Sequence, residues 1–194
     1  MKPDQLHTVH IKNMVCPRCI SVVTDEFNKL ELPVTHVRLG EVDLTQEPTA
    51  QQLAAIKGAL QAQGFELLED KKAELVEKVK VAIINLIRTG EIESLQVNLS
   101  DYLASYTGRD YHYLSTAFSE QEGVTIARYV VLQKIERVKE LISYNELTLS
   151  QIAYQLGYSS VAHLSAQFKQ VTGMTTSDYK KESTSPRKPL DQVL

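Results

Sequence analysis

The sequence has few cysteines, no long hydrophobic run and little net charge, and each shortage narrows the class of protein. It contains only two cysteines in 194 residues, too few for the disulfide framework of a small secreted domain. No apolar run approaches the roughly 18 residues of a membrane-spanning helix, and no apolar segment follows the start as in a signal peptide. We therefore expect a soluble, cytoplasmic protein with no membrane contact.

Charge is distributed unevenly along the chain. Residues 1–70 hold six Lys/Arg against ten Asp/Glu, and the remainder hold fifteen against fourteen. The acidic first part is a poor candidate for binding nucleic acid, and the nearly neutral second part gives no electrostatic indication of it. With 43% hydrophobic residues and a net charge of −3, the composition is that of a globular protein long enough for two small domains.

The two cysteines, Cys16 and Cys19, stand where a strand-like segment gives way to a helix-like one. Two thiols with this spacing at the start of a helix can bind the same soft ion. The helix N-terminus and the neighbouring Arg18 both favour the thiolate, which is the form that binds metal. Pro17 fits the first helical position, because its missing N–H needs no partner there.

The apolar pattern of residues 1–69 predicts four strands and two helices. Strands are expected over 6–11 and 65–68, with two more on either side of Gly40; helices are expected over 17–30 and from Thr49 to Gly64. The order β-α-β-β-α-β predicts a ferredoxin-like domain of minimal size.

This order, with the motif Met14-x-Cys16-x-x-Cys19 on the first loop, resembles the heavy-metal-associated domain of copper chaperones and metal-transporting ATPases. The resemblance covers residues 5–69. It implies that the two cysteines bind Cu(I) or another soft ion, that Met14 packs beneath the loop and that Phe65 lies near the site. Ag(I), Hg(II) and Zn(II) are weaker candidates than Cu(I); two thiolates leave Zn(II) short of its usual four ligands.

Other interpretations of the cysteine pair stay open. The pattern Cys-Pro-x-Cys also occurs in thioredoxin-like redox proteins, although that fold needs a longer domain. A homodimer that bridges one ion with four cysteines is a further variant. The sequence also has Asn13 where glycine is common in the family, and an asparagine tolerates a left-handed backbone.

Residues 70–182 are predicted to be all-α. Apolar residues from Leu75 to Ile87 form one face of a helix that ends at Gly90, and short helices then alternate with tight turns. The later helices are expected over 101–106, 110–122, 125–143, 151–156 and 160–171, with Ser100 and Ser150 as N-caps of the first and fourth.

An internal repeat lies within this all-α part. The segment Tyr113-Leu114-Ser115 with Phe118 and Gly123 recurs as His163-Leu164-Ser165 with Phe168 and Gly173, at identical offsets. The repeat predicts two helix-turn-helix units held by one long helix.

The second unit carries Ile152-Ala153-Tyr154-Gln155-Leu156-Gly157-Tyr158-Ser159, followed by Leu164-Ser165, Phe168-Lys169 and Thr172-Gly173-Met174-Thr175. These segments resemble the DNA-binding domain of the AraC/XylS transcription regulators, over about residues 75–182. The resemblance implies binding to double-stranded DNA. No motif places a histidine beside a candidate serine and acid, so we expect no enzyme.

The family's base-reading positions, carried across by this resemblance, fall on His112, Ser115, Thr116, Val161, Ala162 and Ala166. None of the six is an arginine, lysine, asparagine or glutamine, the side chains that read guanine or adenine most specifically. Arg109, Lys169 and Lys134 are expected to contact phosphate, and Gln167 lies either near DNA or on the packing side.

We therefore predict a metal-responsive DNA-binding transcription regulator. Its domains are expected at residues 1–69 and 70–182, followed by a polar tail at 183–194 that we expect to be disordered. Two alternatives stay open: a metal-delivery or buffering protein whose helical domain docks on a protein partner, and a thiol-redox-sensing regulator.

Overall fold

The computed structural model describes residues 6–181, so the tail predicted at 183–194 lies outside the described residues. The chain divides into two compact units that meet in sequence between Val81 and Ala82. This division falls inside helix α3 (Lys71–Thr89), whereas the boundary predicted from the sequence precedes that helix. In the described part of the chain, no helix is long and apolar enough to cross a membrane.

Between residues 6 and 70, the first unit contains four strands and two helices in the order β-α-β-β-α-β. They are β1 (His7–Lys12), α1 (Pro17–Lys29), β2 (Val34–Arg38), β3 (Glu41–Leu44), α2 (Ala50–Ala62) and β4 (Glu66–Leu68). The strands form one antiparallel sheet in the order β2-β3-β1-β4. Because β1 is an interior strand, the sheet fixes the point where the cysteine loop begins.

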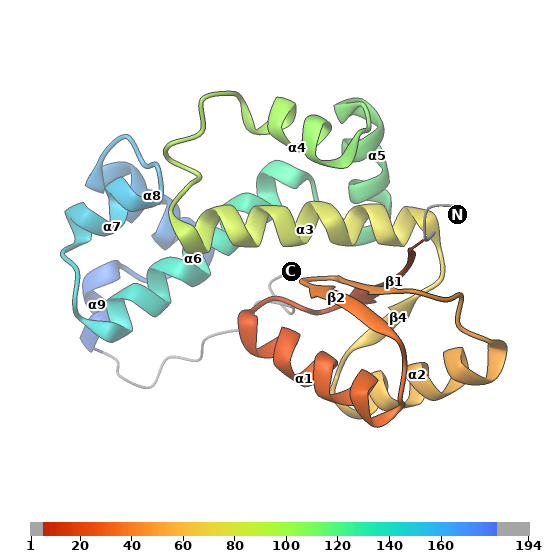
Figure 1. Cartoon of the computed structure of the whole chain (residues 1–194). Coiled ribbons are helices and arrows are strands. Elements are labelled where there is room, and N and C mark those ends of the chain that lie inside the picture. The colour runs from red at the N-terminus through yellow and green to blue at the C-terminus, as the bar shows by residue number, and fades with distance from the viewer. Residues whose placement is uncertain (1–5, 182–194) are drawn as a thin grey trace. The chain divides into compact units, whose positions relative to one another are not determined.

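Helices α1 and α2 cover one face of this sheet (Figure 1). Alternation along β1 directs Val9 and Ile11 to that face, where they pack with Phe27 of α1 and Ile56 of α2. Helix α2 begins after Thr49, as predicted, because Thr49 forms a reciprocal capping box with the residue three positions later.

The first part of α3 lies against the other face of the sheet (Figure 1). Lys78 Nζ on α3 is 2.8 Å from Glu41 Oε1 on β3. On the neighbouring strand β1, His10 Nε2 is 3.5 Å from Glu74 Oε2. These contacts attach residues 71–81 of α3 to the sheet of the first unit.

Beyond α3, the described part of the second unit is all-α, as predicted. Its helices are α4 (Leu99–Thr107), α5 (Tyr111–Glu122), α6 (Ile126–Tyr144), α7 (Leu149–Gln155), α8 (Val161–Thr172) and α9 (Thr176–Lys181). Tight turns join α4 to α5 and α7 to α8, and in each turn a glycine, Gly108 or Gly157, has a positive φ. Helix α6 connects the two helix pairs (Figure 1).

Two predicted helix starts are wrong by two residues. Helix α4 begins after Asn98 and not after Ser100, and α7 begins after Thr148 and not after Ser150. Thr148 forms a capping box with Gln151, an arrangement that needs a glutamine or glutamate three residues after the cap. Ser150 has an alanine at that position, so the cap forms earlier.

Candidate metal centre and nucleic-acid interface

Cys16 and Cys19 lie in the first turn of α1. Cys16 is the N-cap residue and Pro17 is the first helical residue, as predicted. The backbone N–H of Cys19 donates a 2.9 Å hydrogen bond to the Cys16 carbonyl, and this turn brings the two Sγ atoms to 3.3 Å. Because a metal–thiolate bond is about 2.3 Å long, one ion can contact both sulfur atoms. The structure thus brings the two predicted ligands together, and the ion itself stays a prediction.

The electrostatic environment of Cys19 differs from the one predicted. Burial raises the pKa of the Cys19 thiol, and the hydrogen bond with the Cys16 thiol raises it further. Backbone hydrogen bonds oppose this shift without cancelling it. The expectation of a favoured thiolate is therefore wrong for Cys19. It rested on the helix N-terminus and Arg18, whereas burial disfavours the charged form of the thiol. A bound cation favours the thiolate form, since metal binding displaces thiol protons.

Met14 supports the loop from below. Its side chain is completely buried, at 0% exposure, in the core cluster that also contains Phe27 and Phe65. Since Met14 stands two residues before Cys16, this packing anchors the start of the loop. The preceding Asn13 has a φ of 74°, the left-handed conformation expected at the position where the resembled family often has glycine.

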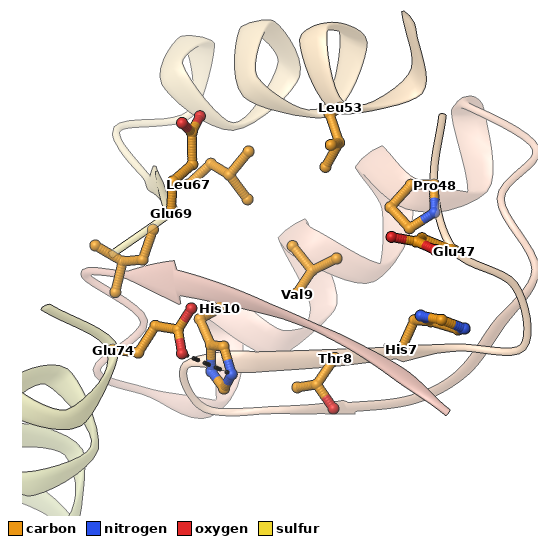
Figure 2. Close-up of a pocket in the computed structure, with 11 residues that line it drawn as sticks. His7, Thr8, Val9, His10, Glu47, Pro48, Leu53, Leu67, Glu69 and Glu74 are labelled. Atoms are coloured by element: carbon orange, nitrogen blue, oxygen red, sulfur yellow. Dashed lines mark ion pairs between the residues drawn. The ribbon is translucent and has the colours of Figure 1, made fainter. Parts of the chain in front are cut away.

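A recess of about 220 Å³ opens beside β1 (Figure 2). It is lined by His7, Thr8, Val9, His10, Glu47, Pro48, Leu53, Leu67, Leu68, Glu69 and Glu74. The His10 ring lies between two carboxylates, with Nδ1 3.5 Å from Glu41 Oε1 and Nε2 3.5 Å from Glu74 Oε2. Burial lowers the pKa of His10, although Glu74 and Glu41 oppose that shift.

Across residues 6–181, no group of three or more histidine, cysteine, aspartate or glutamate side chains could hold a metal ion.

The predicted DNA-contacting residues lie on two helices of the second unit. His112, Ser115 and Thr116 belong to α5, and Val161, Ala162, Ala166 and Lys169 belong to α8, while Arg109 lies in the turn before α5. All are exposed except Ser115 and Val161, which are half-buried. On the opposite sides of these helices, Leu114 and Phe118 of α5 and Leu164 and Phe168 of α8 are buried. The buried residues fix the helices in the domain and leave the candidate faces accessible.

Two further residues considered from the sequence act inside this unit. Lys134 Nζ lies 5.3 Å from the centre of the Tyr158 ring, and burial lowers the pKa of its ammonium group. The head group of Lys134 is therefore engaged with Tyr158, and its expected phosphate contact stays a prediction. The Tyr158 hydroxyl donates a 2.7 Å hydrogen bond to Gln167 Oε1, and burial raises its pKa to about 12. Gln167 is thus on the packing side.

Sequence reasoning did not single out two exposed tyrosines of this unit. Tyr154 on α7 is 70% exposed, and Tyr113 on α5 is 51% exposed. Tyrosine hydroxyls can donate hydrogen bonds to phosphate oxygens, so both residues are candidates for contacts with the phosphate backbone of DNA. The sequence pattern that could have indicated their exposure is a tyrosine next in sequence to a core residue of an amphipathic helix, here Tyr154 after Ala153 and Tyr113 before Leu114.

A protein-family model described as a helix-turn-helix domain matches residues 103–182. This part of the chain is similar to that family. The chain is 30% identical over 89 residues to the F1 operon positive regulatory protein of Yersinia pestis, covering 46% of this chain and 29% of that protein. It is 33% identical over 78 residues to an uncharacterised HTH-type transcriptional regulator of Staphylococcus aureus (strain MSSA476), covering 40% of this chain and 10% of that protein.

The chain thus spans less than a third of the length of these two curated relatives. Among solved structures, a DNA-binding transcriptional dual regulator from Escherichia coli K-12 is similar over 56% of this chain and 91% of that chain, with 22% identity and a TM-score of 0.48. By name, the two relatives are a positive regulatory protein and an HTH-type transcriptional regulator.

Proposed function

We propose that the protein is a transcription regulator of the AraC type that binds double-stranded DNA and responds to a soft metal ion. The ion, Cu(I) before Ag(I), Hg(II) or Zn(II), is held by Cys16 and Cys19. The first unit is then a ferredoxin-like domain of the heavy-metal-associated kind. One observation carries the proposal: the same chain holds two partly buried thiols 3.3 Å apart and a helix-turn-helix domain over residues 103–182. Thiolates favour soft ions, and the relatives are regulators.

The DNA-binding face of the proposal consists of α5, α8 and the turn before α5. Arg109 and Lys169, both exposed, contact phosphates and set the position of the domain on the duplex. Ala162 and Ala166 are small and exposed, so they contact thymine methyl groups and give little discrimination among other bases. Phosphate contacts then supply most of the affinity.

The experiment that tests the proposal is enrichment of genomic DNA fragments by the purified full chain. The protein is presented metal-free and Cu(I)-loaded, both under reductant. A few fragments should be enriched, more strongly in one metal state. Equal enrichment in both states would keep DNA binding and remove Cu(I) as the effector. No enrichment in either state would favour a metal-delivery protein whose helical domain docks on a protein.

Two sets of variants control this experiment. In Cys16→Ser/Cys19→Ser, enrichment should no longer depend on metal. Ala166→Glu places a carboxylate against phosphate and should abolish enrichment, while Ala127→Glu adds the same charge at an exposed position on α6 and should not. A metal response that appears only when reductant is omitted would favour the redox-sensing alternative. Sedimentation with and without metal reports a homodimer bridged by one ion.

A further inference from the structure

We infer that Glu77 on α3 is a positioning residue that couples metal occupancy of the cysteine loop to α3. The inference rests on the proposed function. The backbone N–H of Asn13 donates a 3.0 Å hydrogen bond to Glu77 Oε1. The side-chain amide of Asn13 also donates a 3.2 Å hydrogen bond to the Gly64 carbonyl. Asn13 therefore joins the start of the cysteine loop to α3 and to Gly64, two residues before β4.

Asn13 is well placed to respond to events at the thiols. It stands three residues before Cys16, and three residues span at most about 11 Å. The intervening Met14 is completely buried. Its side chain is therefore held in the core and does not move to compensate for a change in position at Cys16. An ion held by both sulfur atoms fixes the turn from Cys16 to Cys19, and the short segment between Cys16 and Asn13 carries this constraint to the Asn13–Glu77 hydrogen bond.

The Glu77 carboxylate is itself held in place. Its Oε2 lies 3.6 Å from Lys80 Nζ, and the side chains of Glu77 and Lys80 are 7% and 5% exposed. A buried ion pair on one helix has few alternative side-chain positions, so a change at the Asn13 amide acts on the helix backbone. Helix α3 continues to Thr89, past the division at Val81/Ala82, and a change in α3 therefore involves residues of the second unit.

The inference is tested with two double variants that differ only at residue 77, the hydrogen-bond acceptor of the Asn13 N–H. Glu77→Leu/Lys80→Met removes the acceptor and its ion-pair partner together, so that no buried charge is left uncompensated. Glu77→Gln/Lys80→Met removes the same charges but keeps a side-chain oxygen that can accept from Asn13 N–H. For both full-length variants and the parent, DNA affinity is measured metal-free and with Cu(I) alone, and NMR follows hydrogen exchange of the Asn13 amide.

In the parent, Cu(I) should change DNA affinity by at least about fivefold, the lower end of ordinary allosteric coupling, and should change Asn13 amide exchange. The leucine variant should keep the metal-free DNA affinity within about twofold and lose the metal response, and the glutamine variant should retain it. A leucine variant that responds as the parent does would overturn the role of Glu77 and leave the proposed function standing. If Cu(I) left hydrogen exchange of the Asn13 amide unchanged in the parent, the role of Glu77 would be overturned as well. A parent whose DNA affinity ignores Cu(I) would overturn both.

Discussion

The ring of Phe118 on α5 meets the ring of Tyr129 on α6 edge-on, with centroids 5.3 Å apart and planes at 61°. The same contact recurs between Phe168 on α8 and Tyr179 on α9, at 5.5 Å and 75°. In both places the phenylalanine is completely buried, at 0% exposure. Each helix that carries candidate DNA contacts is thus fixed by an aromatic pair formed with the helix that follows it.

The repeat extends into the start of that following helix. Thr125 Oγ1 accepts a hydrogen bond from the backbone N–H of Arg128, and Thr175 Oγ1 accepts one from that of Asp178. The two caps stand at equal distances before Tyr129 and Tyr179. The same local chemistry therefore orients the tyrosine at both places.

Phe168→Ala should lower the free energy of unfolding by about 3–5 kcal/mol, because it removes a buried aromatic side chain and leaves a cavity. Urea denaturation followed by circular dichroism measures the change. Tyr113→Ala on α5, where the side chain is 51% exposed, is the control and should shift stability by about 0.5 kcal/mol or less. An equal loss in both variants would contradict the anchoring role of the Phe168–Tyr179 pair.

The local patterns of the sequence predict much of this fold, since they depend on residues close together in the chain. The apolar alternation of β1, the glycine turns and the threonine at Thr49 all follow from short-range chemistry. The start of α4 was misplaced because Asn98 and Ser100 are both cap-competent, and Asn98 makes no side-chain cap hydrogen bond that a pattern could indicate. The start of α7 could have been placed from the sequence, since its capping box joins Thr148 to Gln151, three positions later.

The parts of the candidate site that the sequence does not reveal depend on distant residues. Asn13 and Glu77 are 64 positions apart, and no periodicity links them. The raised pKa of Cys19 and the engagement of Lys134 with Tyr158 both result from burial, which a sequence pattern shows only for apolar residues. The spacing of the cysteines, by contrast, was sufficient to place both thiols in one helical turn.

Cys16→Ser and Cys19→Ser should each abolish high-affinity Cu(I) binding, because one thiolate alone leaves the ion without its second sulfur ligand. Competition with a chromogenic Cu(I) chelator under reductant measures the affinity. Ser21→Ala, at an exposed position on α1, should bind as the parent does. A Cys16→Ser protein that competes as well as the parent would contradict the proposed metal centre.

Met14→Ala should lower the free energy of unfolding by about 2–5 kcal/mol, whereas Met14→Leu, which nearly conserves volume, should cost less than about 1.5 kcal/mol. Met14→Leu should also keep the parent's Cu(I) affinity, because the side chain is completely buried in the core. Chelator competition on the leucine variant is the decisive measurement, and a large loss of affinity would mean that the thioether is a ligand.

His10→Gln should flatten the pH dependence of stability below pH 6.5. Burial lowers the pKa of His10 from its ordinary value of 6.5, with Lys78 acting in the same direction and Glu74, Glu41 and Asp43 opposing. The unfolded chain therefore binds more protons than the folded chain below that pH, and stability falls as pH falls. Urea denaturation above and below pH 6.5 measures this slope, and an equally steep slope in the variant would assign it to other groups.

Lys169→Gln should weaken DNA binding by a similar factor for every sequence tested and reduce the salt dependence of that binding. Removing one phosphate contact lowers the slope of log K against log salt concentration by about one. Fluorescence anisotropy over a series of salt concentrations, with an enriched fragment and a scrambled one, measures both effects. Lys29→Gln removes the same charge from an exposed side chain on α1 and should leave the slope unchanged. An equal reduction of the salt slope in both lysine variants would mean that the effect comes from net charge and not from a phosphate contact on α8. If Lys169→Gln weakened binding to the enriched fragment alone, Lys169 would be a base-reading residue instead.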